Sequence, residues 1–182
     1  MSEAFSCLVW NVRGLNDRAR RTVVRSLVAA HRPSFVCLQE TKISDRVADF
    51  AIEILGTTFQ YDFVPPVGAS GGILLAWSSP AWEVSNVWKG HFSLSVQLTR
   101  PGSADFTWWL TTVYGPQPDI DKAQFLDELR EFRAVAGGPW LLCGDFNMIY
   151  RAQDKNNDRL DRRCMRRFRR FLSELLLEEI EI

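Results

Sequence analysis

Two hydrophobic runs that lie far apart in the chain each deliver a carboxylate where the run stops. The run at residues 140–143 leads to Asp145 and Asn147, and the run at residues 35–38 leads to Glu40. An ionised group is costly to bury without a partner, so a carboxylate at the end of a buried strand is expected to have a role. Two such strands favour a fold in which both strand ends share one polar pocket.

Magnesium is the ion we expect in that pocket, because it binds through one or two carboxylates and completes its shell with water and substrate phosphate. Phosphodiester hydrolysis needs a metal that offsets phosphate charge and a positioned nucleophilic water. Glu40 is the predicted metal ligand, and the alternative is a strand-end glutamate paired with Lys42. Asp145 is predicted to orient or deprotonate the water, and the alternative is a turn aspartate that closes the strand.

Three further polar side chains accompany strand-like runs. Asn147 can donate a hydrogen bond to a phosphate oxygen, or it can form an Asx turn after the strand. Asn11 ends the first run and would reach the same rim as Glu40 if their strands are parallel neighbours. Tyr114 ends a long run, where its hydroxyl can reach a phosphate or its ring can only pack. The convergence of all these residues at strand ends is what points to a site.

The order of the predicted elements is typical of an α/β protein. A strand at residues 4–10, a helix and a strand at residues 34–38 form a predicted crossover unit. Successive strands between residues 59 and 114, separated by Pro, Gly, Ser and Asn, resemble an antiparallel meander. A further helix, the strand that leads to Asp145 and a last helix near residues 160–178 complete the pattern.

Trp108 and Trp109 are adjacent in one predicted strand, so their side chains point to opposite faces of the sheet. Burying both rings requires cover on each face. The pair therefore predicts a layered sandwich instead of a sheet that is open to water on one side. A length of 182 residues fits one domain that spans residues 1–182.

The formal net charge is zero, so no overall field attracts nucleic acid. Basic residues are nonetheless concentrated in residues 151–170, where Arg166, Arg167 and Arg170 are candidates for contact with nucleic-acid phosphates. The alternative for this stretch is a solvated helix face.

The four cysteines, at positions 7, 37, 143 and 164, show no CxxC spacing. Three of them fall in strand-like apolar runs, where a free cysteine behaves as a small hydrophobe. We therefore predict neither a zinc site nor a disulfide framework. The sequence shows no signal peptide and no apolar run of membrane-spanning length, which predicts an intracellular protein with no membrane partner.

Five motifs, taken in order, resemble those of the endonuclease/exonuclease/phosphatase superfamily: residues 10–15, 39–42, 70–72, 113–116 and 144–147. Within that superfamily the chain is most similar to the endonuclease domain of plant non-long-terminal-repeat retrotransposons. Arg13 supports this choice, because the related abasic-site repair nucleases often carry a metal-binding acid at that position.

This resemblance implies a four-layer α/β sandwich of two mixed sheets packed face to face, with helices outside. It also implies a phosphodiesterase that nicks DNA and uses Mg²⁺, with Mn²⁺ as an alternative. Lys42 and Gln39 would support the site from behind. The implied metal-binding set is Glu40, Asp145, Asn147 and Asn11, and the implied catalytic set is Asp145, Asn147, Tyr114 and Asn11.

Two later motifs of the family are missing, an Arg-Ile-Asp-Arg-like segment and a terminal Ser-Asp-His, and no His follows Asn147. The resemblance thus predicts a domain that lacks its C-terminal part, exposes unpaired sheet edges and has weak or no nuclease activity. It also implies a nuclear protein, in the setting of a longer reverse-transcriptase polyprotein. No obligate protein partner is evident.

Three functions stay open from the sequence. The preferred one is a metal-dependent DNA endonuclease of retroelement origin. The second is a phosphatase or phospholipid phosphodiesterase on the same scaffold, which would use the same metal site. The third is a non-catalytic remnant that binds nucleic acid through the basic residues 159–170.

Overall fold

The computed structural model describes residues 5–67, 70–154 and 161–180. The chain opens with strand β1 (Cys7–Asn11), helix α1 (Arg18–His31) and strand β2 (Phe35–Gln39). The two strands are parallel, and Asn11 lies opposite Gln39 in the register. This is the crossover unit that the sequence predicts, and it brings the ends of both strands to one level.

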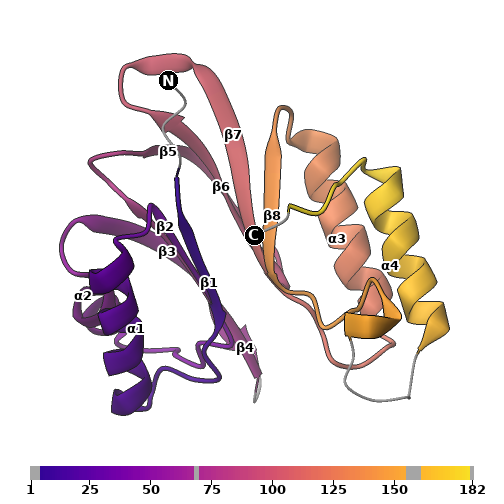
Figure 1. Cartoon of the computed structure of the whole chain (residues 1–182), viewed down its shortest axis with the longest axis horizontal. Helices are drawn as coiled ribbons and strands as arrows, with labels where there is room; N and C mark the ends of the chain where they lie inside the picture. Colours follow the sequence, from indigo (N-terminus) through magenta and orange to yellow (C-terminus); the bar gives the residue numbers. More distant parts are fainter. Residues whose placement is uncertain (1–4, 68–69, 155–160, 181–182) are drawn as a thin grey trace.

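The first sheet has the order β1-β2-β4-β3 and is mixed. Strands β3 (Phe59–Val67) and β4 (Ser70–Ser78) pair antiparallel, and β4 also pairs antiparallel with β2. Helix α1 and helix α2 (Val47–Leu55) cover the outer face of this sheet (Figure 1). The core on this face consists of apolar residues from both helices and from β2 and β4, among them Val24, Val28, Ala51, Ile54, Val36, Leu38 and Leu74.

The second sheet has the order β5-β6-β7-β8 and is also mixed. Its first three strands, β5 (Glu83–Lys89), β6 (Ser93–Arg100) and β7 (Ser103–Tyr114), are antiparallel neighbours. Strand β8 (Trp140–Asp145) runs parallel to β7, with Tyr114 opposite Asp145. The crossover between these two strands is helix α3 (Lys122–Val135).

Helices α3 and α4 (Arg162–Glu174) cover the outer face of the second sheet (Figure 1). A short 3-10 helix, Ala152–Asp154, precedes α4, which is shorter than the sequence pattern predicts. Asp161 caps α4 by accepting hydrogen bonds from two backbone N–H groups of its first turn. Aromatic and aliphatic side chains of the two helices bury the core on this face: Phe125, Leu126, Leu129, Phe168 and Phe171.

The inner faces of the two sheets pack against each other and complete a four-layer α/β sandwich, as the sequence predicts. Trp108 belongs to the core between the sheets, whereas Trp109 packs against Phe132 of α3, with ring centroids 5.0 Å apart. The adjacent tryptophans therefore lie on opposite faces of β7, and both faces are covered.

The predicted meander is divided between the two sheets. Strands β3 and β4 form a hairpin in the first sheet, whereas β5, β6 and β7 form the meander of the second. The turn between β4 and β5 carries the chain across, and Trp82 beside it is buried in the core between the sheets. A turn of this composition looks the same in the sequence whether the next strand stays in the sheet or leaves it.

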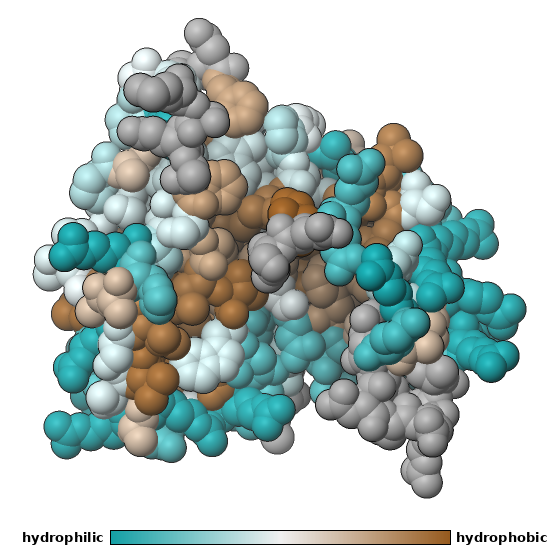
Figure 2. All heavy atoms as spheres, viewed as in Figure 1, coloured by the Kyte–Doolittle hydropathy of each residue, from teal (hydrophilic) through white to brown (hydrophobic). Residues whose placement is uncertain are grey.

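Strands β1 and β8 each end one sheet and pair along one side only. Val9 of β1 is 40% exposed, and every residue of β8 is only partly buried. Figure 2 shows hydrophobic residues exposed in the middle of this face. Among the described residues, no helix combines the length and the apolar character that crossing a membrane requires.

Candidate active site

Four of the predicted site residues lie where a parallel pair of strands ends. Asn11 is the last residue of β1, and Glu40 follows the end of β2. Tyr114 and Asp145 are the last residues of β7 and β8 and lie opposite each other. Because each sheet contributes one parallel pair, both pairs deliver their polar side chains to the same rim of the sandwich (lower part of Figure 1).

Asn11 joins the two sheets at this rim. Its Nδ2 donates a hydrogen bond of 2.7 Å to Oδ2 of Asp145, and its Oδ1 accepts one of 3.1 Å from the backbone N–H of Arg13. Asn11 is also a hydrogen-bond partner of Glu40. The two carboxylates that the sequence places on distant strands therefore share a neighbour, which is the convergence we expected.

Glu40 is an ionised, mostly buried carboxylate. Its Oε1 lies 2.8 Å from Nζ of Lys42, and 17% of its side chain is exposed. Burial acts to raise the pKa of Glu40, but hydrogen bonds from Lys42 and Asn11 and the positive charge of Lys42 bring it below its ordinary value. The ion pair that we weighed as an alternative to a metal ligand is thus present.

Tyr114 keeps its phenolic proton. Burial, followed by the negative charges of Glu40 and Asp145, raises the pKa of Tyr114 to about 12. Its ring packs against the core between the sheets, while its hydroxyl is a hydrogen-bond partner of Glu40. Both roles considered for Tyr114 are therefore compatible, because the ring packs and the hydroxyl faces the carboxylates.

The turn after β8 fixes Asp145 and Asn147 relative to each other. Oδ1 of Asp145 accepts a hydrogen bond of 3.0 Å from the backbone N–H of Asn147, an Asx turn formed by Asp145, which was weighed as a turn aspartate, and not by Asn147. Nδ2 of Asn147 donates to the carbonyl oxygen of Gly115 at 2.7 Å, and its Oδ1 accepts from Nε2 of Gln117 at 2.6 Å. Gln117 carries no motif, and only the folded chain brings it to the site.

Left-handed backbone conformations are concentrated at this rim. Arg13, Glu40, Lys42 and Asn147 all have φ between 48° and 55°. Such conformations cost free energy in residues other than glycine, and they are often found where a site needs a particular side-chain direction. Gly72 lies next to this segment, because its carbonyl oxygen accepts a hydrogen bond of 3.1 Å from the backbone N–H of Thr41.

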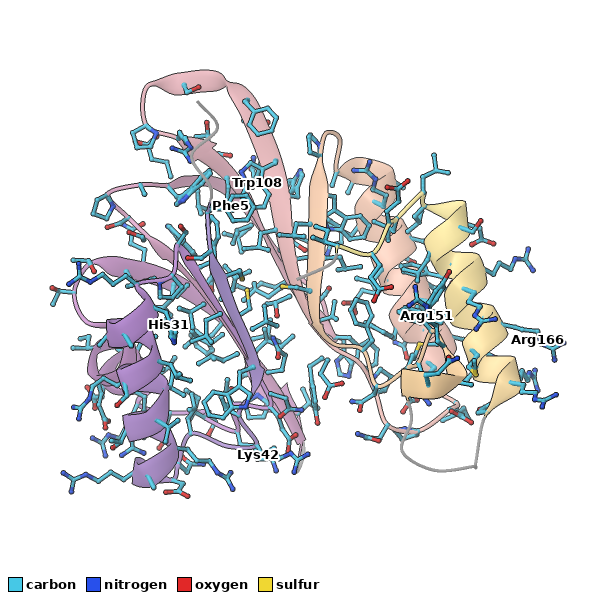
Figure 3. All side chains as sticks on the ribbon, viewed as in Figure 1. Phe5, His31, Lys42, Trp108, Arg151 and Arg166 are labelled. Atoms are coloured by element: carbon cyan, nitrogen blue, oxygen red, sulfur yellow. The ribbon has the colours of Figure 1, made fainter. Side chains whose placement is uncertain are left out.

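Gln39 supports the site from below. It is 1% exposed, and its Nε2 donates to Oγ1 of Thr112 at 2.8 Å, which forms a second link between the two sheets. Lys42 points toward the rim in Figure 3 and is bonded to Glu40. Both residues therefore lie beside the candidate site, and their supporting role stays a prediction.

Two hollows flank the rim. The first, of about 380 Å³, is lined by side chains around the Asn11–Asp145 hydrogen bond, and Arg13 and Arg20 give it positive charge. The second, of about 220 Å³, is lined by Tyr114, Gln117 and His91 among others. No sequence pattern singles out Arg20, which lies on α1 and reaches the rim only in the folded chain.

The three arginines proposed to contact nucleic acid lie elsewhere. Arg166, Arg167 and Arg170 belong to α4, on the outer face of the second sheet, and none of them lines either hollow. Arg166 points away from the sheets in Figure 3. Arg170 is paired with Glu174 at 2.7 Å. The structure therefore separates this basic helix from the rim.

The chemistry of the rim fits a hard divalent cation. The available donors are the carboxylates of Glu40 and Asp145 and the amide oxygens of Asn11 and Asn147, and all of them are oxygen atoms. Magnesium prefers oxygen ligands and typically takes one or two carboxylates. Lys42 and the Asn11 amide now satisfy the carboxylates, as cationic and polar donors do where negative charge is gathered.

Comparison with known proteins agrees with this architecture. The 3′ phosphatase NExo from Neisseria, solved with a product DNA hairpin, has a TM-score of 0.69 and 17% identity, covering 94% of this chain and 71% of that one. ANGEL2, a 2′,3′-cyclic phosphatase, has a TM-score of 0.64 and 15% identity, covering 80% and 53%. TDP2 from Caenorhabditis elegans has a TM-score of 0.59 and 20% identity, covering 84% and 50%.

These identities show a shared fold, and the chain spans only about half the length of ANGEL2 and TDP2. No curated protein matches the chain. The model of the "Endonuclease/Exonuclease/phosphatase family" matches residues 8–173, which is nearly the whole sequence. The chain therefore belongs to the endonuclease/exonuclease/phosphatase family.

Proposed function

We propose that this chain is a metal-dependent phosphodiesterase that cleaves DNA internally, derived from a retroelement endonuclease. The observation that carries the proposal is the hydrogen bond between Asn11 and Asp145, which joins the strand ends of two sheets beside Glu40. In a site assembled from two sheets in this way, a metal ligand, a proton acceptor and a hydrogen-bond donor to phosphate would lie together. The retroelement lineage rests on the motifs alone.

A divalent cation, Mg²⁺ or Mn²⁺, would be held by Glu40 and Asp145 with the amide oxygens of Asn11 and Asn147. When bound, it would offset the charge of the phosphate. Lys42 holds Glu40 in place through its ion pair.

The chain's own residues supply the rest of the chemistry. Asp145 accepts a proton from the attacking water, and its two oxygens are oriented by Asn11 and by the backbone of Asn147. Tyr114 stays protonated, so its hydroxyl donates a hydrogen bond to a phosphate oxygen. Arg13 and Arg20 line the adjoining hollow, where they attract the phosphodiester backbone.

A phosphatase or phospholipid phosphodiesterase on the same scaffold is the second candidate. NExo is a 3′ phosphatase and ANGEL2 a 2′,3′-cyclic phosphatase, so similar folds carry out phosphate chemistry other than endonucleolytic cleavage. The third candidate, a non-catalytic remnant that binds nucleic acid through α4, is favoured only by the exposed arginines of that helix.

One experiment separates the three candidates. Plasmid nicking and phosphate release from a 3′-phosphorylated DNA hairpin are measured with magnesium for the wild type, Glu40→Gln and Asp145→Asn. We expect nicking that both substitutions abolish, and unchanged nicking in Asp49→Asn, whose carboxylate pairs with Arg46 on the surface. Phosphate release without nicking would favour the phosphatase. Salt-sensitive DNA binding with neither activity would favour the remnant.

A further inference from the structure

Three of the four cysteines meet between the two sheets. Cys7 lies on β1, Cys37 on β2 and Cys143 on β8, and their sulfur atoms all lie within 4.8 Å of one another. The sulfur atoms of Cys7 and Cys37 are 3.7 Å apart. Figure 3 shows sulfur atoms in the layer between the sheets. No local spacing predicts this cluster, because each thiol comes from a different strand.

The three cysteines are buried to different degrees. Cys37 is fully buried in the core between the sheets, whereas Cys7 and Cys143 are only partly buried. Cys7 and Cys143 lie on β1 and β8, which form unpaired edges of their sheets. A small ion could therefore enter from solvent and would be held against an apolar wall.

We propose that Cys7, Cys37 and Cys143 bind one thiophilic cation, Zn²⁺, with a water as the fourth ligand. Zinc binds thiolate sulfur at about 2.3 Å and prefers a tetrahedron, in which neighbouring sulfurs lie about 4 Å apart. The three sulfurs are already close to that spacing, so only small side-chain adjustments are needed. Three protein ligands and one open position are the arrangement that zinc accepts where water has access.

Neighbouring groups suit this use. The three thiols hydrogen-bond one another, which lowers the pKa of the Cys7 thiol; the pKa of Cys37 is raised by its bonds to Cys143 and Cys7 and by burial, and the pKa of Cys143 is raised as well, so one thiolate is favoured in the cluster. The hydroxyl of Thr112 is a hydrogen-bond partner of Cys143 and itself accepts from Gln39 at 2.8 Å. Ordered hydrogen bonds behind the ligands are a usual feature of metal sites and fix the direction of each ligand.

A disulfide would involve only two of the three cysteines, whereas a cation can bind all three. A disulfide joins two sulfurs at about 2.05 Å and leaves the third thiol unused. Cys7 and Cys37 are also not direct partners in the sheet, because Cys37 lies opposite Val9 and Cys7 opposite Phe35. A shared cation engages all three thiols and cross-links β1 and β2 to β8. Asn11 and Asp145 lie farther along β1 and β8, so the same cross-link would hold their strands together below the rim.

The test is the metal content and spectrum of the whole chain, purified with reductant and without chelator. We expect one zinc per chain by elemental analysis and native mass spectrometry. Replacement by Co²⁺ should give thiolate-to-cobalt charge-transfer absorption. Both signals should disappear in Cys7→Ser and in Cys143→Ser, two residues that are only partly buried, and the folding of each variant is checked by circular dichroism.

Cys164→Ser is the matched control, because Cys164 lies on α4 beside Asp119 and Asp161 and away from the three-thiol cluster. This variant should keep both signals, and zinc should raise the melting temperature of the wild type and the control but not of Cys7→Ser. Copper bound in place of zinc on the same three residues would keep the site and change its ion.

Three outcomes would overturn the proposal. One is a wild type that takes up neither zinc, cobalt nor copper. Another is a metal signal lost in Cys164→Ser and kept in Cys7→Ser. The last is a disulfide between two of the three cysteines, found by mass spectrometry after free thiols are blocked, in a chain that binds no metal when reduced.

Discussion

The two sides of the candidate active site hold their carboxylates in different ways. On the side of the first sheet, Glu40 forms an ion pair, because Nζ of Lys42 lies 2.8 Å from its Oε1. On the side of the second sheet, Asp145 accepts hydrogen bonds from uncharged donors, the amide of Asn11 and the backbone N–H of Asn147. A charged partner favours a carboxylate that stays ionised. The contrast suits Glu40 to holding a cation and Asp145 to receiving a proton.

The largest effect should come from removing each carboxylate and should differ between the two sides. Asp145→Asn keeps a side chain of the same size but cannot accept the water's proton, so turnover at saturating magnesium should fall by about 10²–10⁴. Glu40→Gln should chiefly raise the magnesium concentration needed for half-maximal nicking. The measurement is the nicking rate as a function of magnesium concentration.

Calorimetric titration with magnesium repeats this comparison without turnover, with weakened binding expected mainly in Glu40→Gln. Equal changes in magnesium dependence for the two variants would show that the two sides do not divide the roles in this way.

A smaller effect, on the free energy of unfolding, should follow when Gly72, which lies beside the segment of Glu40, is replaced by alanine. Gly72 has φ +87°, and an added Cβ would lie 2.5 Å from Oγ1 of Thr41. Gly72→Ala should lower the free energy of unfolding by about 1–3 kcal/mol beyond the cost of the backbone conformation alone. Urea unfolding gives this number.

Gly102→Ala is the matched control, because Gly102 also has a positive φ, +76°, and its added Cβ would have open space around it. It should show only the backbone cost, of about 1–2 kcal/mol. Equal destabilisation of the two variants would mean that the segment of Thr41 and Lys42 shifts without cost to accommodate the added methyl group. The backbone beside Glu40 would then not be rigid.

Much of the fold could be predicted from the sequence, because it depends on local patterns. The apolar runs around Cys37 and Cys143 indicate two strands, of which β2 is buried and β8 only partly buried, and the adjacent Trp108 and Trp109 indicate that one sheet is covered on both faces. The sheet to which a strand belongs depends on where a turn directs the chain. For that reason the strands between residues 59 and 114 could not be divided correctly in advance.

The site was predictable to the extent that its residues end strands. Asn11, Glu40, Tyr114 and Asp145 could be found because strand ends can be identified from the sequence. Gln117 could not, because its link to Asn147 depends on how two loops meet. The meeting of Cys7 with Cys143 was also hidden, since it depends on which strands face each other across the sandwich.

Removing the charge on Lys42 should make the Glu40 side resemble the Asp145 side. Glu40 has a pKa in the folded chain below its ordinary value, so its contribution to stability is present above that ordinary value and is lost as pH falls through the folded pKa. Lys42→Gln should raise the pKa of Glu40 and make unfolding less sensitive to acid.

Denaturant unfolding from neutral to acidic pH measures this change. Arg46→Gln is the control, because it breaks an exposed ion pair with Asp49 that should matter little. An unchanged acid dependence in Lys42→Gln would show that Lys42 does not set the charge of Glu40.

The smallest expected effect is read at Tyr114, which senses both sides at once. Burial comes first among the causes that raise its pKa to about 12, followed by the charge of Glu40 and then by that of Asp145. Glu40→Gln should therefore lower the pKa of Tyr114 more than Asp145→Asn does. The phenolate absorbance is titrated for each variant. The same titration of Tyr114→Phe gives the signal of the other tyrosines, which is then subtracted.

The raised pKa of Tyr114 also makes the stability of the folded chain depend on pH. Its contribution is present below the ordinary value of 10.0 and is lost as pH rises toward about 12. Tyr114→Phe should accordingly unfold with a weaker dependence on pH in that range. A larger pKa change from Asp145→Asn than from Glu40→Gln would reverse the comparison, because it would place the stronger field at Tyr114 on the side of the second sheet.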